Sequence, residues 1–138
     1  MEELIWGSNY EIGIEEIDRQ HMEYVKLLRR FNSGLQNALP VAIQLQILKE
    51  LLKYAEYHFC SEENIMILTK YPYLEGQQFE HSRFLITLER KVGDYRRSRQ
   101  GGEELTAFLY DWFVNHTQIE DRKIAAYLLK EQKTKAES

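Results

Sequence analysis

Each of the four histidines lies on the apolar face of a predicted helix, the face expected to point into a protein core. His21 and His58 lie in the first half of the chain, and His81 and His116 lie in the second. Around each, mostly apolar residues recur at steps of three and four, the pattern of a seam facing a bundle core. One core histidine alone is usually a hydrogen-bonded polar residue. Four imidazoles on four seams instead predict a site for iron, zinc, copper or manganese.

Two carboxylates share these seams. Glu62 follows His58 by four residues, and for these two alone an ordinary i,i+4 helix pair would suffice. Asp121 follows His116 by five residues, and the apolar pattern resumes cleanly only when it is restarted from Asp121. We therefore predict one π-turn between His116 and Asp121, a feature that gathers at functional sites. A carboxylate in an apolar seam is costly unless it is paired or binds a cation.

The combined ligand set indicates two ions rather than one. Six side chains are too many for one tetrahedral ion with an open position, whereas two ions can share carboxylates in a bundle core. The single cysteine, Cys60, is predicted to point away from the seam, so no thiolate favours a structural zinc site. Iron is favoured because a histidine-rich di-iron core binds dioxygen reversibly or reduces it. The predicted metal ligands are His21, His58, Glu62, His81, His116 and Asp121.

Prolines and glycines divide the chain into the elements that would carry these ligands. Pro40 suits the first turn of a helix, Pro72 follows the end of a long one, and Gly101–Gly102 marks a third break. We expect one domain over residues 1–138, an all-α, antiparallel up-down-up-down four-helix bundle with an N-terminal arm packed across it. The arm is predicted over residues 1–13 and the helices near 14–38, 41–69, 74–98 and 103–131. The fourth seam is predicted to include Leu105, Leu109, Trp112, His116 and Ile119.

Composition narrows the class of protein. The 138 residues are 43% hydrophobic and 29% charged, as in a globular domain, and the net charge of −4 offers no basic surface for nucleic acid. The apolar stretches are too short to span a bilayer, and the start of the chain lacks the basic and apolar regions of a secretory signal. We expect a cytoplasmic protein without nucleic-acid or membrane partners; the sequence identifies no protein partner.

Four ordered motifs resemble those of the bacterial hemerythrins and cover nearly the whole chain. The family's opening is similar to Trp6, Gly13-Ile14 and Ile17-Asp18-Arg19-Gln20-His21. Its HFxxEExxM block matches His58-Phe59-Cys60-Ser61-Glu62-Glu63 with Met66. Its YP…H…EH block resembles Tyr71-Pro72 followed by Glu80-His81, and its WxxxHxxxxD block matches Trp112-Phe113-Val114-Asn115-His116 with Asp121.

The resemblance implies dioxygen as the ligand and two iron ions with a bridging oxo or hydroxo group as the cofactor. It implies that one iron, with a position open to dioxygen, is held by His21 and His58, that the other is held by His81 and His116, and that Glu62 and Asp121 bridge the two. In the family, dioxygen binds the open iron as a hydroperoxide. The expected dioxygen pocket contains Phe113, Trp112 and Trp6, and Trp6 and Tyr10 of the arm are expected to help exclude water.

One position departs from the family pattern. Four residues before His81 the family has a third histidine for the second iron, and this chain has Gln77. Gln77 could bind iron through its carbonyl oxygen, could hydrogen-bond a water that replaces the imidazole, or could leave the iron site weak or empty; we favour the water. Phe113 is a milder departure, because the family often has an aliphatic residue there. Its ring either narrows the dioxygen pocket or simply repacks the core.

The leading hypothesis is a non-catalytic protein that binds dioxygen for storage, delivery or sensing. The alternative is a di-iron enzyme acting on peroxide or nitric oxide, because Gln77 would leave an exchangeable position on the second iron. The fate of the oxygenated form separates the two: it is stable and reversible in a carrier and decays with turnover in an enzyme. A third class, an iron-handling or signalling module, would depend on a partner.

Overall fold

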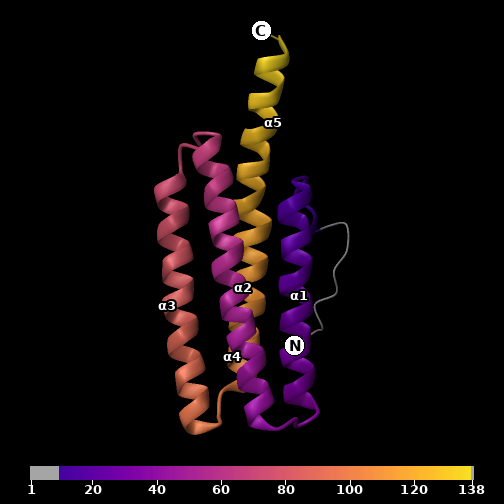
Figure 1. Ribbon diagram of the computed structural model, residues 1–138, viewed down its shortest axis with the longest axis vertical. Helices are drawn as coiled ribbons and strands as arrows, with labels where there is room; N and C mark the ends of the chain where they lie inside the picture. The colour runs from indigo at the N-terminus through magenta and orange to yellow at the C-terminus, as the bar shows by residue number, and fades with distance from the viewer. Residues whose placement is uncertain (1–9, 138) are drawn as a thin grey trace.

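The fold consists of four long helical segments that run antiparallel to one another (Figure 1). The computed structural model describes residues 10–137, with side chains described up to residue 133. The first three segments are α1 (Glu15–Gln36), α2 (Val41–Leu68) and α3 (Leu74–Ser98). The fourth runs without a break through α4 (Gly102–Trp112), a π-helix η2 (Phe113–Asp121) and α5 (Arg122–Glu137). The prediction of an all-α four-helix bundle is confirmed, and the described residues form no strand.

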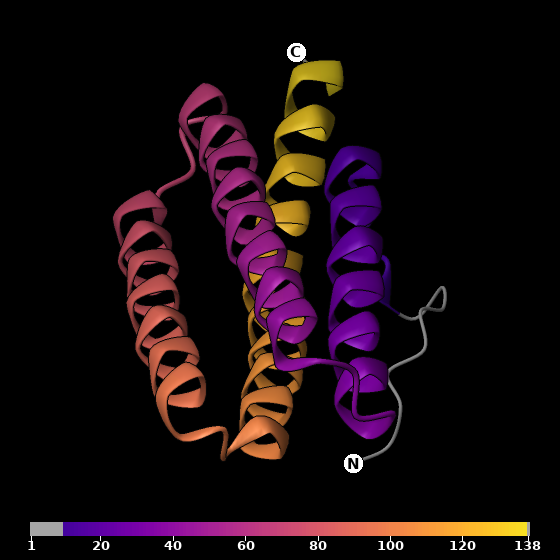
Figure 2. The ribbon, with the colours of Figure 1, turned by 60° about the horizontal axis from the view of Figure 1, so that its bottom comes forward.

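Short turns at the predicted breaks join the segments. Two of them, between α1 and α2 and between α3 and α4, lie at the same end of the bundle (Figure 2). Pro40 immediately precedes α2, where its missing N–H costs no hydrogen bond. The turn before α4 needs Gly101, whose φ of +85° is the left-handed conformation that side chains disfavour. The last part of α5 extends beyond the other helices (Figure 1).

The fourth segment contains the π-turn predicted from the five-residue spacing, and it is longer than one turn. The π-helical region covers nine residues and ends at Asp121. Because its hydrogen bonds run from i to i+5, His116 and Asp121 lie on one inward face, and both are buried. The prediction that Ile119 lies on the inner seam is wrong, since its side chain is 51% exposed. The wider turn rotates Ile119 outward and buries Thr117 instead.

The core consists of two apolar clusters with a polar layer between them. The larger cluster contains Phe31, Leu48, Leu88 and Leu109 and fills the part of the bundle near the α1–α2 and α3–α4 turns. The smaller cluster is formed by Met66, Tyr71 and Ile124. Along each helical segment, the predicted ligands lie between residues of these two regions. Within residues 10–137 no helix is both long and apolar enough to cross a membrane.

Candidate metal centre

The polar layer brings the six predicted ligands together in the interior. All are buried, and they come from all four helical segments: α1, α2, α3 and η2. Their ligand atoms form two groups, each with its atoms within 4.8 Å of one another. The first group is His21, His58, Glu62 and Asp121; the second is Glu62, His81 and His116.

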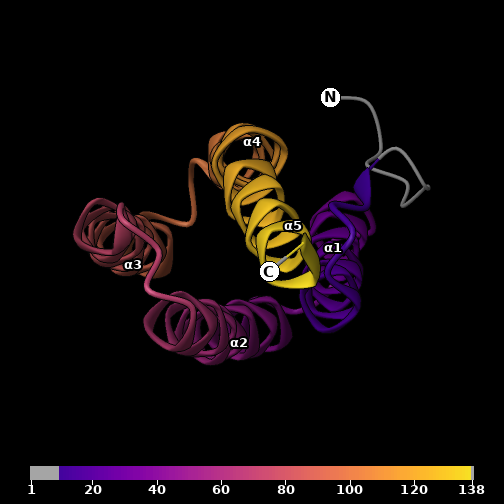
Figure 3. The same cartoon turned by 90° about the horizontal axis from the view of Figure 1, so that it is seen from above.

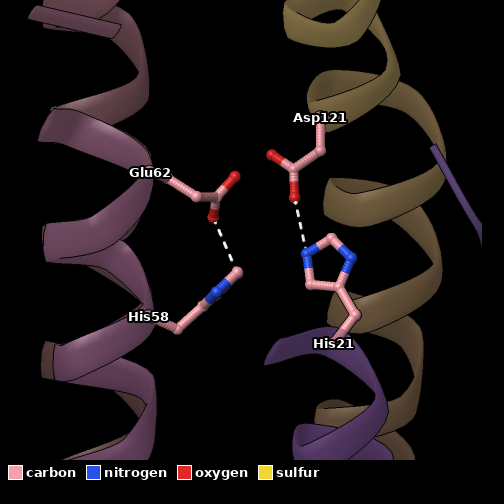
Figure 4. Close-up of side chains that lie close together, drawn as sticks. All are labelled: His21, His58, Glu62 and Asp121. Atoms are coloured by element: carbon pink, nitrogen blue, oxygen red, sulfur yellow. Dashed lines mark ion pairs between the residues drawn. The ribbon is translucent and has the colours of Figure 1, made fainter. Parts of the chain in front are cut away.

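In the first group, two imidazoles each face one carboxylate (Figure 4). His58 Nε2 lies 2.8 Å from Glu62 Oε1, one helical turn along α2. His21 Nε2 lies 3.1 Å from Asp121 Oδ2, which joins α1 to the end of η2. Glu62 and Asp121 point toward each other across the space between their helices (Figure 4).

In the second group, two imidazoles face each other directly. His81 Nε2 lies 3.1 Å from His116 Nε2. His116 Nε2 also lies 3.2 Å from Asp121 Oδ1, and His81 Nε2 lies 3.8 Å from Glu62 Oε1. Each carboxylate therefore approaches one imidazole of each pair, which is the placement a bridging ligand requires.

Two of the four outward ring nitrogens have hydrogen-bond partners, whereas Nδ1 of His21 and Nδ1 of His116 have none among the described residues. His58 Nδ1 donates a hydrogen bond to Gln20 Oε1 at 2.7 Å, and His81 Nδ1 donates to Glu63 Oε2 at 2.8 Å. Such partners fix the tautomer, so that Nε2 presents its lone pair to the centre. His116 Nδ1 lies 3.4 Å from Glu80 Oε2, a looser contact without an aligned hydrogen bond.

These outer partners could not be predicted from the apolar seams, because each lies beside a seam rather than on it. Gln20 directly precedes His21 and Glu80 directly precedes His81, yet each contacts a histidine of a different helix. Glu63 follows Glu62 and reaches His81 on α3. Their position next to a ligand in the sequence was the one available signal, and it could not show which imidazole they would meet.

The described residues do not satisfy the polar atoms of the centre as a hydrogen-bond network. With Nδ1 of His81 donating to a carboxylate, the Nε2 atoms of His81 and His116 would oppose lone pairs at 3.1 Å unless a cation or a proton lay between them. Both carboxylate oxygens of Glu62 and of Asp121 are buried without an aligned hydrogen bond from any described residue. Such burial is costly. Two nitrogens that share an ion at about 2.1 Å lie roughly 3 Å apart, so the residues present fit metal ions.

The pKa values of the clustered side chains also depart from their ordinary values, because their charges are buried close together. Burial raises the pKa of Glu62 to about 7, and the negative charge of Asp121 adds to the shift. Burial also lowers the pKa of His81 to about 3, with a further contribution from His116. Burial opposes a charge on His116, but the carboxylates of Asp121, Glu62 and Glu80 together outweigh it and raise the pKa of His116 to about 9. A bound cation would favour the ionised carboxylates and neutral imidazoles that ligate metals, with release of protons.

Gln77 lies at the edge of the same layer. It is four residues before His81 on α3, so the two side chains lie on one side of the helix. Its side chain is 3% exposed, and its carbonyl oxygen has no hydrogen-bond partner among the described residues. A buried, unpartnered carbonyl oxygen beside the second imidazole pair is compatible with direct ligation or with a bound water.

The aromatic residues expected at a dioxygen pocket lie against different imidazoles. Phe113 is buried with its ring edge-on to His21 at 5.8 Å between centroids, and it stacks on Tyr24 at 5.5 Å. Trp112 instead stacks on His116 at 4.4 Å. Tyr10 of the arm packs against Phe113 at 5.8 Å. Trp6 lies outside the described residues.

Replacing Glu63 with alanine should weaken metal binding without unfolding the bundle. His81 would lose the acceptor that orients its ring, and loss of such a partner typically costs about 10- to 100-fold in metal affinity. Affinity is measured by competition with a chelator. The matched control is Glu50→Ala, an exposed position on the same helix. Equal affinities for the two variants would mean that Glu63 does not support the centre.

Comparison with known proteins agrees with this chemistry. The hemerythrin HHE cation binding domain family matches residues 12–128. A bacteriohemerythrin of Stenotrophomonas maltophilia is 30% identical over 126 residues, covering 88% of this chain and 79% of the relative. One from Pseudomonas aeruginosa is 30% identical over 125 residues, covering 88% and 78%. One from Clostridium acetobutylicum is 28% identical over 126 residues, covering 87% and 97%.

Proposed function

This chain belongs to the hemerythrin family of HHE cation-binding domains, and from that membership and its buried centre we propose that it binds dioxygen reversibly at a pair of iron ions. The proposed role is oxygen storage, delivery or sensing. The observation that carries the proposal is that Glu62 and Asp121 each approach imidazoles of both groups. When bound, a pair of ferrous ions supplies the electrons that hold dioxygen and recovers them when it leaves.

The proposed assignment of ligands follows the two groups of side chains. One ion would be held by His21 and His58 and the other by His81 and His116. Glu62 and Asp121 would be shared, with an oxo or hydroxo group as a further bridge. The outward partners Gln20 and Glu63 would hold the imidazoles in position.

The surroundings of His21 suit a ligand that must be kept from water. The Phe113 ring is almost fully buried and covers the His21 imidazole from its edge, and the stacked Tyr24 closes the layer behind it. Beside the carboxylate pair, the nearest space is lined by Ile17, Ile65 and Ile124. Apolar walls exclude the water and protons that favour irreversible oxidation of the centre.

The second candidate function is an enzyme acting on peroxide or nitric oxide. The observation that favours it is Gln77, whose buried carbonyl oxygen occupies the place of an expected imidazole near His81. A neutral oxygen ligand holds iron less firmly than imidazole, so the second ion would exchange ligands more readily. Rapid decay of the oxygenated form with turnover would support this alternative over a carrier.

Purified protein should contain two irons per chain and should show a visible charge-transfer band in air that disappears under argon. The expectation follows from the two ligand groups and the shared carboxylates. Iron content and spectra under anaerobic and aerated conditions test it directly. One iron or none per chain, or a band that bleaches irreversibly, would contradict the carrier proposal.

A further inference from the structure

We propose that a pocket beside Gln77 gives small, uncharged ligands a second route to the centre, ending at the metal position of His81 and His116. The ligand class is small neutral molecules that bind ferrous iron, with nitric oxide as the probe; dioxygen belongs to the other ion, beside His21, under the proposed function. This inference rests on the metal positions of the proposed function, and it adds a separate route and a separate ligand position.

The pocket has a volume of about 400 Å³ and opens to solvent where α3 faces η2 and α5 (Figure 3). We call it the Gln77 pocket. It is lined by Tyr73, Gly76, Gln77 and Glu80 on one side and by Glu120 and Lys123 on the other. Ample room for a small molecule therefore lies directly outside the polar layer.

Gln77 separates this pocket from the second imidazole pair. It lines the pocket, yet its side chain is 3% exposed and its carbonyl oxygen has no hydrogen-bond partner among the described residues. His81 follows one helical turn later on the same side of α3. A neutral carbonyl is the weakest donor near that metal position, so it is the group that an incoming ligand would displace.

The opposite face of the centre is closed and apolar. There Phe113 covers His21 and stacks on Tyr24, with Tyr10 packed behind it. The space beside Glu62 and Asp121 on that face is lined mainly by isoleucines. The two faces thus differ in wall chemistry, and the face on the Gln77 side is the one with a pocket open to water.

The charges of the Gln77 pocket favour neutral ligands. Two carboxylates, Glu80 and Glu120, line it with one cation, Lys123, which pairs with Glu120 at 3.3 Å. With all three ionised, the lining carries one net negative charge. Small anions such as azide are therefore repelled at the opening, whereas an uncharged molecule meets no such barrier.

Gly76 keeps the opening wide. It lies in the first turn of α3 on the pocket wall, and a Cβ added there meets no atom within 4 Å. A larger side chain at this position can fill the opening without a clash. The replacement also favours the helix, because glycine is a poor helix former.

The first test is the rate at which nitric oxide binds the reduced, iron-loaded protein, followed by stopped-flow absorbance. In Gly76→Leu, one phase of binding should slow by about tenfold while the final stoichiometry and the dioxygen association rate stay unchanged. The matched control is Gly93→Leu on the same helix, where an added Cβ meets only the flexible end of Arg97. Unchanged nitric oxide rates, or equal slowing of nitric oxide and dioxygen, would overturn the second route.

A metal-free test separates failure of the route from failure of the proposed function. The exposed Cys60 is first replaced by serine, and a cysteine is placed at Gln77→Cys or, in the closed core, at Ala55→Cys. The thiol at position 77 should react with iodoacetamide about tenfold faster than the thiol at 55, and Gly76→Leu should remove the advantage. Iodoacetate, the anionic analogue, should be disfavoured relative to its reaction with a free thiol. Equal labelling at the two positions would overturn the route whatever the iron content.

Discussion

Asp121→Asn should abolish the stabilisation of the protein by iron, and it should also lower the stability of the metal-free protein. Asp121 is fully buried and approaches His21 of one group and His116 of the other, so both ion positions lose an anionic ligand. In the wild type, iron at 100 times its dissociation constant should contribute about 2.7 kcal/mol per site. At roughly 4 °C per kcal/mol, that raises Tm by about 10 °C per site.

The metal-free variant should also lose stability, because Asp121 lies 3.1 Å from the His21 imidazole and 3.2 Å from the His116 imidazole and its removal breaks a buried pair. Burial alone would raise the pKa of Asp121, but His116 and His21 lower it well below its ordinary value, so the folded metal-free protein favours the charged carboxylate that the amide removes. Thermal melts with and without iron, together with iron content, provide the measurement. Asp111→Asn, at an exposed position on α4, is the matched control. Retention of two irons and of the full rise in Tm by Asp121→Asn would refute a shared role for this carboxylate.

Gln77→His should lengthen the lifetime of the oxygenated form by an order of magnitude or more. The substitution places an imidazole where a neutral carbonyl oxygen now faces the second pair, and imidazole is the better iron ligand. A firmly held ion leaves no exchangeable position through which water or a second ligand promotes decay. The decay of the visible band after oxygenation measures this lifetime.

The control for this experiment is Gln46→His, the same substitution at an exposed position of α2. Iron content of both variants must be measured, so that a longer lifetime is not confused with better loading. An unchanged decay rate in a fully loaded Gln77→His would show that the glutamine does not limit the oxygenated form.

The parts of the molecule predicted well from sequence are those that depend on local period. The four helical segments follow from apolar seams and from breaks at Pro40, Pro72 and Gly101. These signals are local in the sequence and need no knowledge of how the helices pack. The π-helix was predicted by the same kind of argument, since the five-residue step from His116 to Asp121 disagreed with an otherwise regular seam. Its length was not predicted, because the seam samples only one residue per turn, and Ile119 was misplaced for that reason.

The parts that could not be predicted depend on how one helix is rotated against another. Glu63 contacts His81 across two helices, and no pattern within α2 shows that meeting. Phe113 and Trp112 were both expected at the dioxygen pocket, which stays a prediction, and as neighbouring residues on a helix they point about 100° apart. They accordingly lie against His21 and His116, on different imidazole pairs. The pocket beside Gln77 likewise depends on how α3 packs against the fourth segment. The sequence pattern does not predict that packing.

The π-helix has a consequence for how the last part of the chain is phased. In an α-helix each residue turns the chain by about 100°. Because η2 accommodates one extra residue, every side chain of α5 is rotated relative to its position in an unbroken α-helix. Ile124 then faces the small apolar cluster with Met66 and Tyr71. In the frame of an unbroken α-helix it would be turned away from them. The number of residues between His116 and Asp121 therefore fixes the rotation of α5 about its axis. The same rotation that directs the Asp121 carboxylate to the centre also packs Ile124 into the apolar cluster at that end of the bundle.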